Sequence, residues 1–181
     1  MDGKEKTNDK FRQNKGSYRK ALKGLKNCQV AGLKTGLRFT LTKYNFKDLP
    51  YIFELAENES ISRICLYHLV YSGRGEALLN QDLTYDETRA ILEFIWQKTI
   101  DFNERGIKSE ILSVDNHADG IWIYLKLKSY DSHRAKAALK LLSAQGGNGS
   151  GQDIACMDHK GDIYADQFLR NHPLGNLRKK R

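Results

Sequence analysis

The chain of 181 residues has few prolines, few cysteines and no long apolar run. The chain has only two prolines but fifteen glycines, so we expect ordered elements joined by glycine turns. No apolar stretch approaches the roughly 18 to 20 residues of a transmembrane helix, which argues against a membrane-spanning protein. The first residues lack the apolar core of a secretory signal, so we expect a cytoplasmic protein. The three cysteines lie far apart in sequence, which argues against a disulfide framework.

The composition is that of a folded protein with a basic surface. Hydrophobic residues make up 40% of the chain and aromatic residues 10%, enough to form a core and to exclude wholesale disorder. The net charge is +8, and the excess is concentrated in the first 26 residues and in a run over 178–181. Such charge suits a polyanionic partner or a solvated lysine-rich surface. We favour the second interpretation because aromatic residues are not interleaved with the lysines, and a nucleic-acid partner is not expected.

Hydrophobic periodicity predicts alternating helices and strands. The predicted elements are a helix over 18–28, a strand over 37–42, a helix over 49–56, a strand over 63–70, a helix over 82–105, strands over 110–115 and 120–127, and a helix over 132–143. Asn45 and Asp48 resemble a capping pair before the second helix. This order predicts an α/β fold with right-handed crossovers on a parallel sheet.

One strand distinguishes a barrel from an open sheet. In the strand over 37–42, Leu37, Phe39 and Leu41 alternate with polar residues. If the apolar side meets the helices, then Arg38 and its polar neighbours, Thr40 and Thr42, face the opposite way. An open doubly wound sheet needs that face apolar, whereas a barrel lumen around a polar ligand does not. We therefore predict a (β/α) barrel.

The sequence changes character after Ser143. The glycine-rich stretch GGNGSG (146–151) is not a phosphate loop, because it follows a helix and no Lys-Ser or Lys-Thr comes after it. Two short strands over 154–157 and 163–165 are joined by the turn-forming DHKGD. We place a domain boundary near Gly146, with a barrel part over 1–145 and a small appendage over 146–181.

Few side chains are candidates for chemistry. His117 and Asp119 lie in VDNHADG at the end of a predicted strand, where barrel enzymes keep their active sites, although the same residues form capped turns. Arg74 in YSGRG could bind a carboxylate or phosphate, or lie in solvent. Cys28 and Cys65 are expected in the core. Cys156 lies beside the hairpin turn, but one cysteine makes no metal site.

The order of motifs is familiar. The segments MDG, TNDKFR, GLRFTLTKYNFKDLP, CLYHLVYSGRG, VDNHADG, IACMD and ADQF resemble those of radical S-adenosylmethionine (SAM) enzymes that trim side chains of modified haems, in haem d1 synthesis and in the alternative haem pathway. The resemblance implies a partial radical SAM barrel followed by a SPASM-like appendage. It also implies SAM and [4Fe–4S] clusters as cofactors of the full-length family, and a tetrapyrrole propionate as the substrate.

The resemblance assigns roles to individual residues. It places Asp2, Gly3, Arg38, Thr40 and Tyr67 at the cofactor, with Arg38 and Thr40 facing its carboxylate and ribose. It places His68, Arg74, His117 and Asp119 at the substrate, and makes Cys156 the first cysteine of an auxiliary cluster. The strand alternation supports Arg38 independently.

The departure from the family is equally informative. These enzymes carry a CxxxCxxC loop that holds the catalytic cluster, and this sequence has no such spacing. We therefore expect a fragment that is inactive alone, and a separately encoded half carrying CxxxCxxC as its partner. Open sheet edges should favour assembly or aggregation. The alternative is a non-catalytic basic module that binds nucleic acid or an anionic tetrapyrrole.

Overall fold

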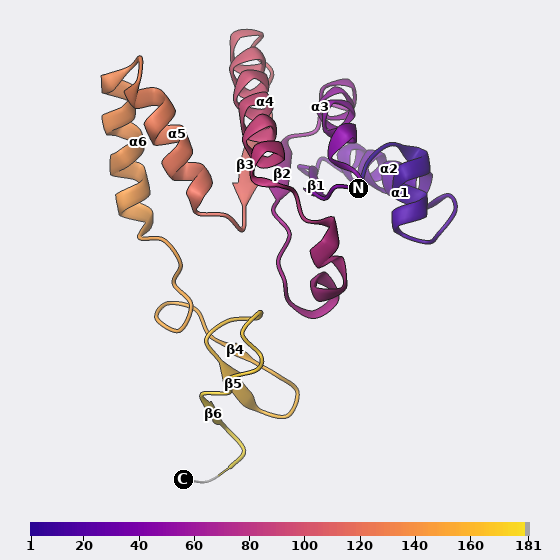
Figure 1. The fold of residues 1–181 in the computed structure, drawn as a ribbon. Helices are drawn as coiled ribbons and strands as arrows, with labels where there is room; N and C mark the ends of the chain where they lie inside the picture. Colours follow the sequence, from indigo (N-terminus) through magenta and orange to yellow (C-terminus); the bar gives the residue numbers. More distant parts are fainter. Residues whose placement is uncertain (180–181) are drawn as a thin grey trace. The chain divides into compact units, whose positions relative to one another are not determined.

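The computed structural model describes residues 1–179 and divides the chain into two compact units (Figure 1). Unit 1 comprises residues 1–70 and 78–116, and unit 2 comprises residues 71–77 and the chain from His117 onward. Gly146, near which the sequence suggests a boundary, lies within unit 2. The last two residues of the basic run over 178–181 lie outside the described residues.

Unit 1 contains the predicted alternation of helices and strands. Its elements are α1 (Glu5–Phe11), α2 (Ser17–Val30), β1 (Gly36–Thr40), η1 (Phe46–Asp48), α3 (Leu49–Asn58), β2 (Arg63–Tyr67), α4 (Tyr85–Glu104) and β3 (Glu110–Val114). A 3-10 segment, η2 (Gly73–Gln81), lies between β2 and α4 in the chain. α4 begins with a capping box, in which the Thr84 hydroxyl accepts from the Glu87 N–H and the Glu87 carboxylate accepts from the Thr84 N–H.

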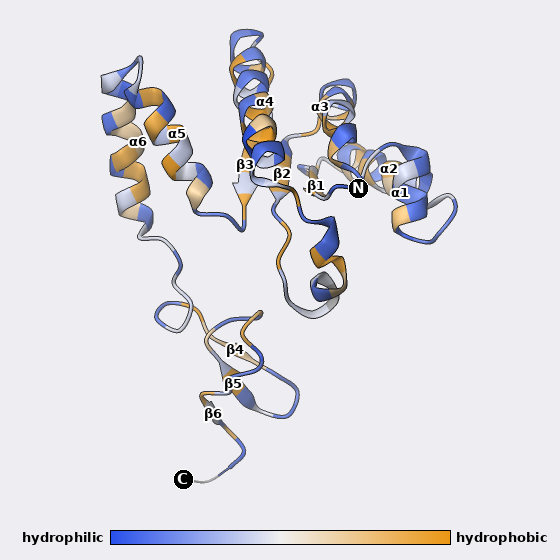
Figure 2. Cartoon of the chain, viewed as in Figure 1, coloured by the Kyte–Doolittle hydropathy of each residue, from blue (hydrophilic) through white to orange (hydrophobic). Residues whose placement is uncertain are grey.

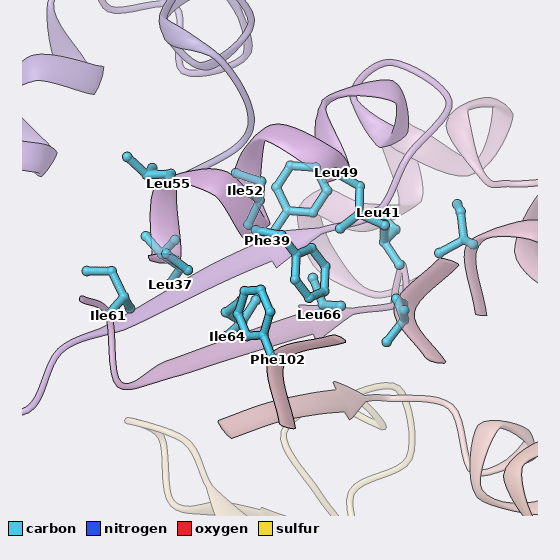
Figure 3. Close-up of a cluster of buried hydrophobic side chains, with 14 residues drawn as sticks. Leu37, Phe39, Leu41, Leu49, Ile52, Leu55, Ile61, Ile64, Leu66 and Phe102 are labelled. Carbon is cyan, nitrogen blue, oxygen red and sulfur yellow. The ribbon is translucent and has the colours of Figure 1, made fainter. Parts of the chain in front are cut away.

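The three strands form a parallel sheet in the order β1-β2-β3. In its register Leu37 lies opposite Ile64, and Phe39 lies opposite Leu66. These four side chains are at most 1% exposed and project toward the helices. Figure 3 shows this cluster between the strands and α3, and Phe102 from α4 belongs to it. The predicted α/β class is confirmed, and the core lies on one face of the sheet only.

The start of α2 is fixed by a carboxylate from the preceding helix. Asp9 accepts hydrogen bonds from the backbone N–H groups of Gly16 and Tyr18 and from the Ser17 hydroxyl. These groups include the first amides of α2, which have no acceptor within the helix. The bond from the Tyr18 N–H is the main reason that the pKa of Asp9 is lowered to about 2, and the bonds from Gly16 and Ser17 contribute to the same shift.

Two sequence expectations near β1 are wrong. Asn45 does not cap a helix with its side chain. Instead its Oδ1 accepts from the N–H and hydroxyl of Thr42, both at 2.9 Å, and its Nδ2 donates to the carbonyls of Thr40 and Asp2. Thr42 therefore does not continue the polar face; it is fully buried in the turn that Asn45 organises.

The part of unit 2 that follows His117 begins with a helical hairpin. It consists of α5 (Ala118–Lys128) and α6 (Ser132–Gln145), where the Asp131 side chain caps α6. The strand predicted over 120–127 is wrong, because this segment is helical. Gly120 explains the packing: a Cβ there would lie 2.6 Å from Leu142 of α6, so the missing side chain allows the two helices close approach. Figure 2 shows apolar residues along both helices.

The remainder of unit 2 is a small antiparallel sheet. The predicted hairpin is confirmed as β4 (Cys156–Met157) and β5 (Asp162–Tyr164), and a third strand, β6 (Gly175–Asn176), pairs with β5. Asp158 forms the turn by accepting from the N–H groups of Lys160 and Asp162. Within residues 1–179, no helix combines the length and the apolar character that crossing a membrane requires.

Replacing Asp9 should change how stability depends on pH. Because folding lowers the pKa of Asp9, its stabilisation is complete above its ordinary pKa and is lost as the pH falls toward about 2. We expect Asp9→Asn to be less stable than the parent at pH 7, and the difference to shrink between about pH 4 and pH 2. Urea denaturation followed by circular dichroism at each pH measures this, and a difference independent of pH would contradict it.

Asn45→Ala should destabilise unit 1. The substitution leaves the buried N–H of Thr42 without its acceptor, and we expect the free energy of unfolding to fall by about 2 kcal/mol. Asn27→Ala, which removes an exposed amide from α2, is the matched control and should have almost no effect. Chemical denaturation compares them, and equal losses would show that Asn45 is not an organising residue.

Candidate functional site

The face of the sheet opposite the core carries the candidate site. The register places Arg38, Cys65 and Leu112 side by side on this face, followed by Thr40 and its neighbours, Tyr67 and Val114, toward the C-terminal ends of the strands. Arg38 is exposed, Thr40 and Tyr67 are half-buried, and none belongs to the core. The prediction that Arg38 and Thr40 face away from the helices is confirmed.

Arg38 is held by an aromatic neighbour on β2. Its guanidinium donates to the Tyr67 hydroxyl, and its Cζ lies 4.8 Å from the centroid of the Tyr67 ring. No carboxylate of the described residues forms an ion pair with Arg38. A planar, oriented guanidinium with remaining N–H donors suits the two oxygens of a carboxylate.

Asp2 lies beside β1 and is tied to it. Its carbonyl accepts from Asn45, its N–H donates to Asn8, and the Met1 amino group donates to the Arg38 carbonyl at 2.8 Å. Burial lowers the pKa of that amino group. The Asp2 carboxylate is only 7% exposed and pairs with the Arg12 guanidinium at 2.5 Å. Asp2 thus joins Arg38, Thr40 and Tyr67 in one region of unit 1, but its charge is already compensated.

Gly3 has a structural role. Its φ is +136°, and a Cβ there would lie 2.5 Å from the Asp48 Oδ2 and 2.9 Å from the Thr7 Cγ2. The same Asp48 oxygen accepts from the Lys4 N–H at 2.9 Å. Only glycine allows the chain to pass so close to Asp48.

The substrate residues suggested by the resemblance are spread over both units. His68 follows β2, and its backbone N–H donates to the Val114 carbonyl at 3.0 Å. His117 is exposed at the start of α5, and Asp119 is 3% exposed in the first turn of that helix. Arg74 lies in η2, and its side chain is outside the described part of the structure.

The described residues do not fit an iron–sulfur cluster. Cys28 is exposed on α2, Cys65 is half-buried on the polar face of β2, and Cys156 is half-buried on β4 opposite Tyr164. The expectation that Cys28 belongs to the core is therefore wrong, and so is that for Cys65. In residues 1–179 no three Cys, His, Asp or Glu side chains gather in a way that could hold a metal ion.

A hollow of about 870 Å3 at the opposite end of the strands was not predicted from the sequence. Its lining includes Lys34, Arg38, Arg63, Cys65, Lys108 and Glu110. Lys34 precedes β1 and Lys108 precedes β3. The parallel register brings these two loops together, and no local sequence pattern indicates that. Arg12 was missed as well, because its contact with Asp2 depends on helix α1, which lies between them in the chain.

Comparisons with known proteins identify relatives along almost the whole chain. It is 47% identical over 180 residues to the Fe-coproporphyrin III synthase of Methanosarcina barkeri, and 33% identical over 181 residues to the pre-heme d1 synthase of Dinoroseobacter shibae. Each match covers 99% of this chain. Along almost its whole length the chain is therefore similar to these two synthases. It spans about 45% of the length of each relative. No protein-family model and no solved structure matches it.

The family resemblance of the motif order is thereby confirmed, while the roles of single residues remain predictions. The identity extends across both units, so GLRFTLT in unit 1 and VDNHADG, which spans the end of unit 1 and the start of the His117 part of unit 2 in the sequence, belong to the same matched region. The names of the two relatives describe those proteins, which are more than twice as long as this chain.

Arg12→Ala tests the contact that places Asp2. Removing the guanidinium leaves a buried carboxylate without its partner, and we expect a loss of about 1 to 3 kcal/mol in the free energy of unfolding. Arg19→Ala is the matched control, since the pair of Arg19 with Glu5 is 78% and 45% exposed and should contribute at most about 1 kcal/mol. Denaturation of both variants measures the difference. Similar losses would mean that the Asp2–Arg12 pair does not organise this region.

Proposed function

We propose that this chain supplies the cofactor-facing latter part of a radical SAM enzyme that acts on tetrapyrrole propionate side chains in haem or haem d1 biosynthesis. The observation that carries the proposal is the 47% identity to Fe-coproporphyrin III synthase over 99% of the chain. The polar sheet face with Arg38 at its centre supports it, because a barrel lumen that holds a charged cofactor needs such a face.

The residues of unit 1 fit SAM better than they fit a cluster. Arg38 would hold the cofactor carboxylate, the Thr40 hydroxyl would donate to its ribose, and Tyr67 would orient Arg38 through the contacts described above. When bound and reductively cleaved, SAM supplies a 5′-deoxyadenosyl radical that removes hydrogen from the substrate. The cluster that reduces it has no fitting set of ligands among the described residues, and we assign it to the CxxxCxxC half of the enzyme.

The remaining residues of the proposal act by binding and orientation. Asp2 and Gly3 would form the wall beside the cofactor, because Asn45 holds the Asp2 carbonyl and Asp48 accepts from the N–H of Lys4, the residue after Gly3. His68, Arg74 and His117 would contact the tetrapyrrole, whose propionates suit cationic and hydrogen-bonding side chains. The Asp119 carboxylate would repel a propionate, so its place at the substrate rests on the family resemblance alone. Cys156 would contribute one ligand to an auxiliary cluster completed by other cysteines.

The test is an anaerobic assay for 5′-deoxyadenosine after reconstitution with iron and sulfide. We expect no turnover from the 181 residues alone, and turnover when a polypeptide carrying CxxxCxxC is co-expressed. In the active pair Arg38→Ala should raise the KM for SAM by about tenfold or more, since a charge-assisted hydrogen bond is lost. Arg89→Ala, an exposed arginine of α4, is the control and should leave KM unchanged. Turnover by the chain alone would overturn the proposal.

A binding assay distinguishes the nucleic-acid form of the non-catalytic alternative, whereas a module that only binds a tetrapyrrole is separated by the 5′-deoxyadenosine assay. A basic module for nucleic acid should lose affinity steeply as salt rises and should not respond to tetrapyrroles. The proposed enzyme part should instead perturb the visible absorption of an iron coproporphyrin, with most of the effect retained at moderate salt. A steep salt dependence with DNA and no tetrapyrrole response would favour the binding module.

A further inference from the structure

A short stretch of the chain is grouped with a part that is distant in sequence. Residues 71–77 belong to unit 2, although the residues before and after them belong to unit 1. The Ser72 hydroxyl donates to the Phe168 carbonyl at 3.0 Å, and the two residues are 96 positions apart. This bond joins the SGRG stretch that follows β2 to the appendage over 146–181, and both lie within unit 2. The appendage therefore contacts the turn that carries Arg74.

Glycines on both sides of Arg74 make this turn dependent on an anchor. Gly73 has a φ of +59°, and Gly75 donates its N–H to the Ser72 carbonyl at 3.1 Å, which closes a turn with Gly73 and Arg74 at its centre. Glycine loses more conformational freedom on ordering than any other residue, so such a turn holds one position only when contacts outside it restrain it. Ser72, the first residue of the turn, supplies such a contact.

The carbonyl that accepts from Ser72 is fixed by a nearby carboxylate. The Asp166 Oδ1 accepts from the N–H groups of Phe168 and Leu169, at 2.7 and 2.9 Å. The Leu169 N–H and the Phe168 carbonyl belong to one planar trans peptide, so they point in opposite directions. By holding the N–H, Asp166 therefore directs the carbonyl toward Ser72.

The glycine-rich stretch supports Asp166 through its second oxygen. The Ser150 hydroxyl donates to the Asp166 Oδ2 at 2.5 Å, and Gly151 donates its N–H to the Ala165 carbonyl at 2.9 Å. The φ of Gly151 is +74°, and a Cβ there would lie 3.3 Å from the Ala165 Cβ, so glycine favours this close approach. The bond from Ser150 is the main reason that the pKa of Asp166 is lowered, and the carboxylate is ionised at neutral pH. GGNGSG thus helps to hold Asp166 in place.

We propose that Ser72 and Asp166 are positioning residues for substrate binding, which hold the turn around Arg74 so that Arg74 meets a propionate of the tetrapyrrole. The inference rests on the proposed function, because it takes Arg74 as a substrate contact. A cation on a restrained turn binds a carboxylate more tightly than one on a mobile turn, since less conformational freedom is lost on binding. Ser72 and Asp166 act through Arg74 and do not touch the substrate. The appendage thereby contributes to substrate binding, apart from any cluster that Cys156 would help to hold.

The experiment measures the affinity of the full chain for an iron coproporphyrin, by titration followed in visible absorption. Ser72→Ala removes the donor, and we expect affinity to fall about three- to tenfold, as for the loss of one hydrogen bond. Ser72→Thr keeps the hydroxyl and should change affinity less than about twofold. Ser143→Ala, which removes an exposed hydroxyl near the end of α6, is the matched control and should bind like the parent. Parent-like affinity in Ser72→Ala would overturn the proposal.

Asp166 is tested in the same titration. Asp166→Ala leaves the amides of Phe168 and Leu169 without their acceptor and should weaken binding as much as Ser72→Ala. Asp166→Asn keeps an oxygen for these amides and should recover most of the affinity. An Asp166→Asn variant as weak as Asp166→Ala would contradict the role given to Asp166. Circular dichroism checks that each variant is folded, and Ser72→Ala, which removes one half-buried hydroxyl, decides the question where Asp166→Ala unfolds.

A double-mutant cycle shows whether Ser72 acts through Arg74. Arg74→Ala should weaken binding about tenfold or more, since a charge-assisted hydrogen bond is lost. With Arg74 already replaced, Ser72→Ala should have almost no further effect, because the group that it positions is absent. A loss of the same size in both backgrounds would reject the positioning role. An iron coproporphyrin with esterified propionates is the ligand control: the parent and Ser72→Ala should bind it equally, and a difference would contradict a role through the carboxylate.

Hydrogen exchange tests the Ser72–Phe168 bond without any ligand. Ser72→Ala should accelerate exchange over residues 71–77 and leave β1, β2 and β3 unchanged, and the absence of any acceleration would overturn the inference. The titration also separates the two proposals. A parent chain that gives no absorption response would reject the proposed function and this inference with it, whereas a parent response that Ser72→Ala retains in full would reject this inference alone.

Discussion

The parallel pairing of β1 with β2 gives every residue of these strands one of two environments. Leu37, Phe39 and Ile64 enter the core, and α3 and α4 cover them. Arg38 and Tyr67 lie on the opposite face by the same alternation. A one-residue shift in register would bury the guanidinium and expose Phe39, so the hydrophobic core and the candidate site are fixed by a single constraint.

Asn45 extends this constraint to the start of the chain. Its four hydrogen bonds join the end of β1, the turn after it and the Asp2 carbonyl in a region that excludes water. A buried amide with all donors and acceptors satisfied specifies one arrangement, because any displacement leaves a buried polar group unpaired. Asp2 and Gly3 are therefore held next to Arg38 by backbone contacts, independently of any ligand.

The two units carry different features that bear on the proposed function. Unit 1 has a polar sheet face with an oriented guanidinium, on which the proposed cofactor role depends. Unit 2 offers a helical hairpin and a small sheet with Cys156, in which turns are made by Asp158 and Asp166 accepting backbone N–H groups. Both lie within the region that the two relatives match.

Local pattern determined much of this protein. Period-two alternation predicted β1 and the orientation of Arg38, periodic apolar residues predicted α2, α3 and α4, and turn chemistry predicted the β4–β5 hairpin. Where a segment is apolar at nearly every position, as over 120–127, periodicity cannot distinguish a strand from a helix. In the structure this segment is a helix that packs closely on α6 at Gly120 and Leu142.

Only the tertiary structure decided which polar groups meet. Asp2 and Arg12 meet across helix α1, Asn45 holds the carbonyl of Asp2, and the strand register brings Lys34 near Lys108. The exposure of Cys28 likewise depends on how α2 packs. Such contacts depend on how the elements pack in three dimensions. Short-range sequence patterns record the burial of single residues along an element, and they carry no information on partners brought together by packing.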